Sequence, residues 1–303
     1  MSSLYLHPLA YLVGLEGVAL MKAFAGEYDR DFTHARLAEV RRLLDSPERW
    51  GDGVELAPLS TPDAYDGWSS TYDDPDNGYF AMDEAALLPM IDRLPVGVAV
   101  DAACGTGRYA AHLAALGHRV HGFDTSPGMI AVARAKVPAA VVGLADMADL
   151  PLADGSVDLV VNTLAMTHVE DLGPVFDEAA RVLRPGGHLL VSDVRGYFPG
   201  SDLTPLVEET TTGELGYMRS WSHPTSHYLQ AAIPAGFLVR DCRELEVGAA
   251  QQDEPTEPPA PPALPVPGEP PSIWALHAWV PEAAHAVHGR RRCLVVWDFE
   301  RDV

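Results

Sequence analysis

VAVDAACGTGRYAAHLAALGHRVHGFD, residues 98–124, is the part of the chain from which its architecture can be inferred. It predicts a buried strand, a turn that contains Gly105 and Gly107, a short helix, and a second strand that ends at Asp124. A glycine-rich turn of this kind lets the backbone approach a ligand closely, with helix N–H groups facing an anion. An acid at the end of the second strand can accept hydrogen bonds from both hydroxyls of a ribose. Together they predict a site for an adenosine-containing cofactor, either NAD or S-adenosylmethionine.

The same alternation of strand and helix continues on the carboxyl side of this stretch. Short runs rich in Val, Leu and Ala occur at 96–103, 118–124, 139–146, 156–164 and 186–194, and helical patterns separate them. Near-continuous apolar strands that alternate with helices are typical of a parallel sheet covered on both faces. We therefore expect an α/β protein with a doubly wound, Rossmann-like sheet.

The flanking regions predict additions to this core. Residues 4–45 have a helical pattern, so we expect residues 1–58 to form an amino-terminal helical cap and residues 59–303 to form the core. Residues 196–230 lie where a lid segment would be inserted. Residues 249–271, rich in Pro, Ala and acids, predict an extended, mobile loop within the core. The run RRCLVVWDF, residues 291–299, predicts a closing strand.

Composition excludes several classes of partner. The 303-residue chain has a formal charge of −22 and a sequence pI near 4.7, which disfavours nucleic acid as a partner. Its three cysteines are far apart in the sequence, as expected in a reducing cytosol and not in a disulfide framework or a zinc site. The apolar amino-terminal stretch contains Glu16, lacks a leading positive charge and is too short to span a bilayer. We expect a cytoplasmic protein without a membrane partner.

Four motifs carry a family resemblance. VDAACGTG (100–107), GFDTSPGMI (122–130), ADMADLPLADGSVDLVV (145–161) and RVLRPGGHLLVSD (181–193) together resemble the class I S-adenosylmethionine-dependent methyltransferases. The small-molecule branch that includes ubiquinone- and menaquinone-biosynthesis-type enzymes is the most similar. The resemblance covers about residues 60–247, implies S-adenosylmethionine as cofactor, and implies a seven-stranded sheet whose last strand is antiparallel.

The resemblance also implies roles for individual residues in cofactor binding. The turn from Ala103 to Gly107 would hold the amino-acid end of the cofactor, and Asp124 would bind the ribose. Asp101 would either order that turn or bind the cofactor's amino group through water. The remaining predicted cofactor-binding residues are Tyr72, Ala103, Gly105, Thr125, Met129, Asp146, Met147 and Asn162. Ala103 departs from the family, which usually has glycine there. A methyl group is tolerable at this position if the residue keeps a negative φ, so we expect a slight shift of the turn and not a loss of binding.

Methyl transfer needs a base only if the acceptor holds a proton that it does not readily lose. Candidate bases are His168, which follows the fourth strand, and His223 and His227 in the lid segment. Aromatic faces attract cations, so Tyr65, Trp68 and Tyr72 could surround a sulfonium. Ligand spacings typical of a metal site are missing from the sequence, and we expect no metal.

The leading hypothesis is S-adenosylmethionine-dependent methyl transfer to a small-molecule acceptor such as a secondary metabolite. A non-methylating cyclisation or rearrangement with the same cofactor is one alternative, and a non-catalytic module that recruits a partner through its Pro-rich segment is another. NAD-dependent oxidation is disfavoured because GxGxxG spacing is missing after the first strand. The amino-terminal helices could roof the pocket or build a homodimer, and the sequence leaves both open.

Overall fold

The computed structural model describes residues 3–74, 78–246 and 263–302. It divides into two compact units. The sheet unit comprises residues 59–245 and 292–303, and the amino-terminal unit comprises residues 1–58 and 246–291. Each unit is described separately below.

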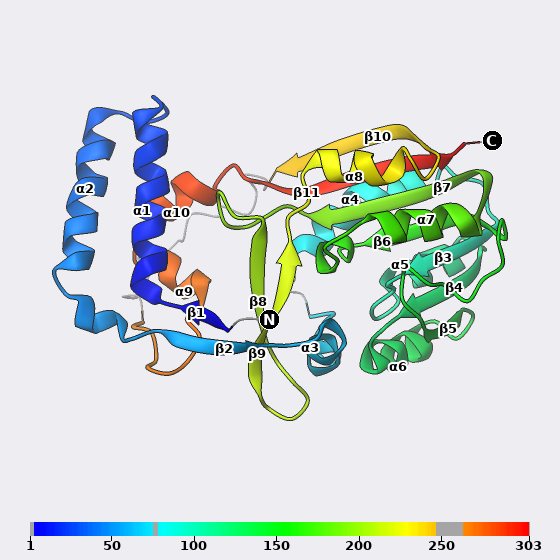
Figure 1. Cartoon of the computed structure of the whole chain (residues 1–303), viewed down its shortest axis with the longest axis horizontal. Helices are drawn as coiled ribbons and strands as arrows, with labels where there is room; N and C mark the ends of the chain where they lie inside the picture. Colours follow the sequence, from blue (N-terminus) through cyan, green and yellow to red (C-terminus); the bar gives the residue numbers. More distant parts are fainter. Residues whose placement is uncertain (1–2, 75–77, 247–262, 303) are drawn as a thin grey trace. The chain divides into compact units, whose positions relative to one another are not determined.

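The sheet unit is built on a seven-stranded sheet in the order β10-β11-β7-β6-β3-β4-β5 (Figure 1). Its strands are β3 (Val98–Ala102), β4 (Arg119–Asp124), β5 (Val141–Leu144), β6 (Val157–Thr163), β7 (Leu183–Val194), β10 (Phe237–Glu246) and β11 (Arg292–Arg301). Strands β5, β4, β3, β6 and β7 run parallel, whereas β11 pairs with β7 in the antiparallel direction. The predicted fold, including the antiparallel closing strand, is confirmed.

Helices cover both faces of this sheet, as its apolar strands require. On one face α7 (Gly173–Val182) and α8 (Thr225–Ala232) pack through Phe176 and Tyr228 against strand residues such as Val100. On the other face α4 (Gly78–Ile91) and α5 (Arg108–Ala115) contribute Leu87 and Leu113. The helix α6 (Pro127–Lys136) packs beside the turn after β3. Because the helices cover the two faces, the edge formed by the carboxyl ends of the parallel strands stays open to a ligand.

Three further elements of the sheet unit surround that edge. The helix α3 (Thr61–Trp68) precedes the sheet in sequence, and the short 3₁₀ turn η2 (Met166–His168) follows β6. The segment expected to be a lid, 196–230, forms the antiparallel hairpin β8 (Leu203–Glu209) and β9 (Leu215–Trp221), followed by most of α8. The sequence predicted no hairpin there.

The amino-terminal unit is helical with one small strand pair. Its elements are β1 (Leu4–Leu6), α1 (Pro8–Phe24), α2 (Arg30–Leu44), η1 (Pro47–Trp50), β2 (Val54–Pro58), α9 (Ile273–His277) and α10 (Pro281–His288). Strands β1 and β2 pair in the antiparallel direction. Leu12 and Leu15 of α1 pack against Val280 and Ala283 at the start of α10. Residues 4–45 are therefore helical over most of their length, with a strand where Leu4–Leu6 was expected to be helical.

The partition of the chain differs from the expected one at its carboxyl end. The boundary at residue 58 coincides with the division between units, but residues 246–291 group with the amino-terminal unit instead of the core. The reason is the apolar face of α9 and α10, which completes the core of α1 and α2. Most of the predicted Pro-rich loop, 249–262, lies outside the described residues, and 263–271 lead into α9 without regular structure.

Candidate active site

The turn between β3 and α5 has three residues in the left-handed region. Ala103, Gly105 and Gly107 have φ angles of 62°, 52° and 83°. The condition of a negative φ at Ala103 is not met, because the chain must reverse tightly enough for Cys104 N–H to donate to the Phe123 carbonyl at 2.8 Å. A left-handed conformation costs a residue with a Cβ about 1–2 kcal/mol. Ala103 is therefore strained at the point where the backbone faces the cavity.

Gly107 is required for a different reason. A Cβ at this position would lie 3.2 Å from the Ala133 Cβ and 3.3 Å from Val137 Cγ2, so glycine allows α5 to start close to α6. At Gly105, by contrast, the nearest atom to such a Cβ is Cε1 of Tyr72 at 3.7 Å. The backbone at Gly105 is thus open toward a ligand, whereas that at Gly107 is packed against the protein.

Asp101 acts within the protein. Its side chain is 1% exposed and accepts a hydrogen bond from Ala110 N–H in α5 at 2.8 Å. Burial raises the pKa of Asp101 to about 7, although the Ala110 hydrogen bond opposes the shift. This carboxyl joins β3 to α5 and so orders the turn between them, one of the two roles that the resemblance implies.

Asp124, at the end of β4, joins the turn to the next helix. Its Oδ2 accepts from Gly105 N–H at 2.8 Å and its Oδ1 from Ser126 N–H at 2.9 Å. Burial raises its pKa, and these backbone donors oppose that rise. Ser126 caps α6 by accepting from Met129 N–H at 3.1 Å, which leaves Asp124 free of the capping role.

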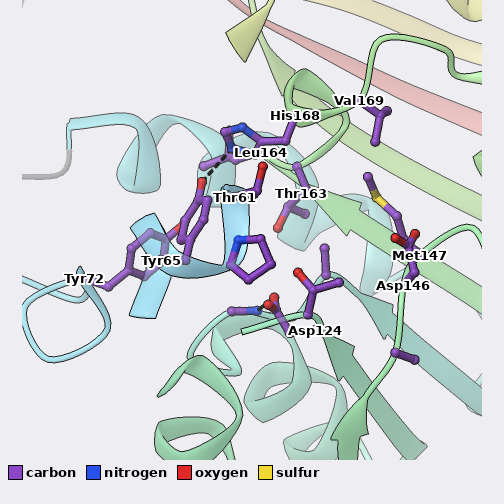
Figure 2. A pocket seen from close by; sticks show the side chains of 16 residues that line it. Thr61, Tyr65, Tyr72, Asp124, Asp146, Met147, Thr163, Leu164, His168 and Val169 are labelled. Atoms are coloured by element: carbon purple, nitrogen blue, oxygen red, sulfur yellow. Dashed lines mark hydrogen bonds between the residues drawn. The ribbon is translucent and has the colours of Figure 1, made fainter. Parts of the chain in front are cut away.

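A cavity of about 260 Å³ opens at the carboxyl ends of these strands (Figure 2). It is lined by Thr61, Pro62, Tyr65, Tyr72, Ala103, Gly105, Asp124, Thr125, Ala145, Asp146, Met147, Thr163, Leu164, Ala165, His168 and Val169. Nine residues predicted for the site are among them: Tyr65, Tyr72, Ala103, Gly105, Asp124, Thr125, Asp146, Met147 and His168. Asp124 and Asp146 both present carboxylates to the cavity, as a nucleoside site requires.

The other predicted residues lie off the cavity. Met129 is fully buried in α6. Asn162 donates from its amide to the Ala102 carbonyl at 2.9 Å and contacts Met147 Sδ at 3.2 Å, so it supports the cavity wall from behind. Asp101, Gly107, His223 and His227 are likewise not among the lining residues. Thr61, Pro62 and Val169 line the cavity but belong to no motif, and nothing in the sequence marks them.

The aromatic side of the cavity contains a hydrogen-bonded pair. Tyr65 Oη of α3 and His168 Nε2 of η2 are 2.6 Å apart, as the dashed line in Figure 2 indicates. Burial lowers the pKa of His168 to about 4, an effect that the backbone of Arg219 partly opposes. Tyr65 also contacts Trp68 and Tyr72, with ring centroids 5.9 Å away in each case. The sequence singled out these groups but not the pairing of Tyr65 with His168.

His223 holds the turn that carries His168. Its Nε2 lies 2.9 Å from the Val169 carbonyl and 3.2 Å from the Met166 carbonyl, so an Nε2–H donates to both ends of η2. Burial lowers the pKa of His223. His223 and His227 line a second hollow with Glu170, Asp171, Leu172, Gly173, Gln230 and Ala231. The structure thus brings one of the three candidate bases, His168, to the main cavity.

Asp193, at the end of β7, fixes the same turn from the other side. Its Oδ1 accepts from Thr167 N–H at 3.1 Å, and its Oδ2 accepts from Tyr228 Oη at 2.6 Å. Thr167 also hydrogen-bonds Ser220 Oγ and donates to the Trp221 carbonyl in β9 at 2.9 Å. Burial raises the pKa of Asp193 to about 7. Although it ends the fourth motif, Asp193 was not predicted to have this role.

Within residues 3–74, 78–246 and 263–302, no three His, Cys, Asp or Glu side chains are grouped so that they could hold a metal ion. Over the same described part of the chain, no helix has the length and apolar character needed to cross a membrane. The strand order, the glycine turn and the acid after β4 define a protein that binds a nucleoside cofactor at the carboxyl edge of a parallel sheet.

Comparison with known proteins specifies the class. Residues 100–191 match the family model described as a methyltransferase domain. A malonyl-[acyl-carrier protein] O-methyltransferase of Yersinia pestis is 42% identical over 95 residues, which cover 31% of this chain and 36% of the relative. A probable S-adenosylmethionine-dependent methyltransferase of Mycolicibacterium smegmatis is 36% identical over 133 residues, which cover 43% of this chain and 51% of the relative. The chain thus spans about a third to a half of the length of these relatives.

Solved structures share the fold. A S-adenosylmethionine-dependent methyltransferase from Mesorhizobium loti superposes with a TM-score of 0.50 at 24% identity, over 73% of this chain and all of the other. Residues 100–191 are thus similar to a methyltransferase domain, and the relative from Mycolicibacterium smegmatis and the structure from Mesorhizobium loti are both named as S-adenosylmethionine-dependent methyltransferases. S-adenosylmethionine is the cofactor of this class.

The residues present fit this cofactor. The open backbone at Gly105 admits its amino-acid end, Asp124 Oδ1 and Oδ2 face a position for the ribose hydroxyls, and Asp146 can accept from the adenine amine. The Tyr65 and Tyr72 rings line the same cavity, where aromatic faces attract a sulfonium. The donor set is therefore the one that a sulfonium nucleoside needs.

Proposed function

We propose that this protein transfers a methyl group from S-adenosylmethionine to a small-molecule acceptor. One observation carries the proposal: the cofactor-binding turn with Asp124 and the Tyr65–His168 pair open on the same cavity. The cofactor supplies an activated methyl carbon. The protein has to bind and align the acceptor and keep water away, and alignment alone can be worth about 7–11 kcal/mol.

The residues divide this work between them. Ala103, Gly105 and Asp124 hold the cofactor, and Tyr72 closes the site over Gly105. Tyr65 and His168 lie where an acceptor can reach both a hydroxyl and an imidazole. The arrangement is compatible with an oxygen, a nitrogen or a carbon atom as the methyl acceptor.

The test combines binding and product analysis. Calorimetry with S-adenosylmethionine and S-adenosylhomocysteine should detect binding of both, and incubation with labelled S-adenosylmethionine and an acceptor panel should transfer the label. A product heavier by about 14 Da, one CH₂, supports methyl transfer. An unchanged product mass would favour cyclisation or rearrangement instead, and failure to bind either nucleoside would overturn the proposal.

The proposal also covers the cellular location, the class of acceptor and the oligomeric state of the protein. All three cysteines are free thiols, which supports a cytoplasmic location. The net charge of −22 supports a small molecule instead of a nucleic acid as the acceptor. Sedimentation of the purified chain would determine whether it forms the homodimer that the amino-terminal helices could build.

A further inference from the structure

The Tyr65–His168 pair has spare hydrogen-bonding capacity at the cavity. A phenol can donate one hydrogen bond and still accept others at its oxygen, and a neutral imidazole has one nitrogen that accepts. When Nε2 of His168 carries no proton, the Tyr65 hydroxyl donates to it across the 2.6 Å separation. The Tyr65 oxygen then remains able to accept a hydrogen bond from a ligand in the cavity.

The charges around this pair are all of one sign. Of the 16 residues that line the cavity, the acids are Asp124 and Asp146, and none is Lys or Arg in the described part of the chain. Burial, and then the nearby Tyr72, Asp124 and Glu208, raises the pKa of Tyr65 well above its usual value. The phenol therefore keeps its proton, and His168, whose pKa burial lowers to about 4, stays neutral at physiological pH.

These surroundings disfavour the binding of an anionic acceptor. A carboxylate taken out of water needs a cation or several donors in compensation. Here it would meet two carboxylates, a neutral imidazole and the neutral hydroxyls of two tyrosines and three threonines, and only the cofactor would contribute positive charge. An uncharged hydroxyl needs only one acceptor for its O–H, and the Tyr65 oxygen provides it.

We propose that the acceptor is an uncharged hydroxyl compound, a phenol or enol, that donates to Tyr65 Oη, and that His168 takes up the proton released on methylation. This inference rests on the proposed function. As the acceptor oxygen bonds to the methyl carbon, that carbon's bond to sulfur breaks, the acceptor proton passes to Tyr65 Oη, and the Tyr65 proton passes to His168 Nε2. A neutral hydroxyl and a sulfonium thus give a neutral ether, a neutral thioether and one protonated imidazole.

Binding of matched probes tests the acceptor class without turnover. The protein loaded with S-adenosylhomocysteine, which has no sulfonium charge, is titrated by calorimetry with 2-naphthol, 2-naphthoate and a panel of similar hydroxyl–carboxylate pairs. At pH 7.5 at least one neutral member should bind, and at least tenfold more tightly than its carboxylate. Equal or tighter binding of the carboxylates, methylation of a malonyl thioester in preference to the hydroxyls, or no binding by any neutral member would overturn the inference.

Two variants then separate binding from proton transfer. Tyr65→Phe removes the hydroxyl, so neutral probes should bind about tenfold more weakly. His168→Gln keeps an acceptor for Tyr65 but cannot take a proton, so probe binding should stay within about twofold while kcat falls about 100-fold, the scale of a lost general base. The matched controls are Tyr28→Phe, at a half-buried tyrosine between α1 and α2 that stacks on Phe32, and His112→Gln, at a histidine paired with Asp92.

The outcomes separate this inference from the function on which it rests. If His168→Gln retains its kcat, or if Tyr65→Phe binds neutral probes as the unaltered protein does, these two residues do not act as inferred even though methyl transfer stands. If S-adenosylhomocysteine does not bind at all, the proposed function itself fails. Thermal unfolding of each variant identifies any loss that results from misfolding.

Discussion

The carboxyl edge of the sheet has two halves that are built in different ways. At β3 and β4, the hydrogen bonds of Asp124 on the cofactor side join residues close in sequence: Asp124 accepts from Gly105, 19 positions away, and from Ser126, two positions away. At β6 and β7, the acceptor side depends on distant partners. Tyr65 reaches His168 across 103 positions, and His223 reaches Val169 across 54.

This difference separates what is fixed by local geometry from what is fixed by packing. A turn whose donors and acceptors lie within one strand–helix–strand unit keeps its shape as long as those strands pair. The η2 turn has two local hydrogen bonds of its own, and longer-range partners add to them: Asp193 in β7, Trp221 in β9 and His223 after β9. We therefore expect changes to the cofactor half to affect nucleoside affinity and changes to the acceptor half to affect turnover.

The largest effect is expected at Asp124. Asp124→Ala removes the ribose acceptor and leaves Gly105 N–H without its partner, and hydrogen bonds to a charged group are worth about 1.5–3 kcal/mol. Affinity for S-adenosylhomocysteine, measured by calorimetry, should fall about 10- to 150-fold. The control is Asp154→Ala, which alters a surface acid paired with Arg181. If Asp124→Ala leaves the affinity for S-adenosylhomocysteine unchanged, the cofactor does not bind at the β3–β4 half of the edge as inferred.

A smaller effect is expected at His223, on turnover and not on nucleoside affinity. His223→Ala leaves the Met166 and Val169 carbonyls without their donor and loosens η2, so kcat should fall about tenfold, equivalent to about 1.4 kcal/mol. Affinity for S-adenosylhomocysteine should remain within twofold. Loss of affinity without loss of kcat would show that the two halves are not separable in this way.

Ala103 provides a stability test of the cofactor half. Ala103→Gly relieves the left-handed strain of about 1–2 kcal/mol but makes the unfolded chain more flexible, which costs about 0.5–1 kcal/mol. The free energy of unfolding in urea should rise by about 0.5–1 kcal/mol. A decrease would mean that the Ala103 methyl makes contacts worth more than the strain.

The smallest effect is expected at His227. It lines the second hollow with His223 but not the main cavity. His227→Ala should therefore leave kcat and nucleoside affinity within twofold of the unaltered protein. A tenfold loss of kcat would place the acceptor nearer to α8 than Tyr65 and His168 imply.

The same division explains how much the sequence could predict. The hydrophobic periodicity, the positions of the glycines and the acids at strand ends predicted the parallel sheet and most of the cofactor side. They could do so because each of these signals acts within about 20 residues. Met129 belongs to the second motif and Asn162 directly follows the third, but Met129 faces the core and Asn162 lies behind the cavity wall. A motif specifies which residues recur, and the rotation of a helix or strand decides which of them reach the cavity.

The acceptor side could not be predicted in the same way. Nothing in the spacing of Tyr65 and His168 indicates that they meet, since α3 comes from before the sheet and η2 from the middle of it. The carboxyl-terminal helices were assigned to the core for a similar reason, because their apolar face could pack against either unit. Partner choice between amphipathic surfaces is a tertiary property that the pattern of one segment does not contain.

The distribution of the three thiols has a practical consequence. Cys104, whose pKa burial raises far above its usual value, and Cys293 are enclosed, whereas Cys242 on β10 is exposed. A maleimide fluorophore should therefore attach to one position of the natural chain without prior removal of the other cysteines. The labelled chain would then carry one fluorophore at a defined position on β10, away from the residues that line the main cavity.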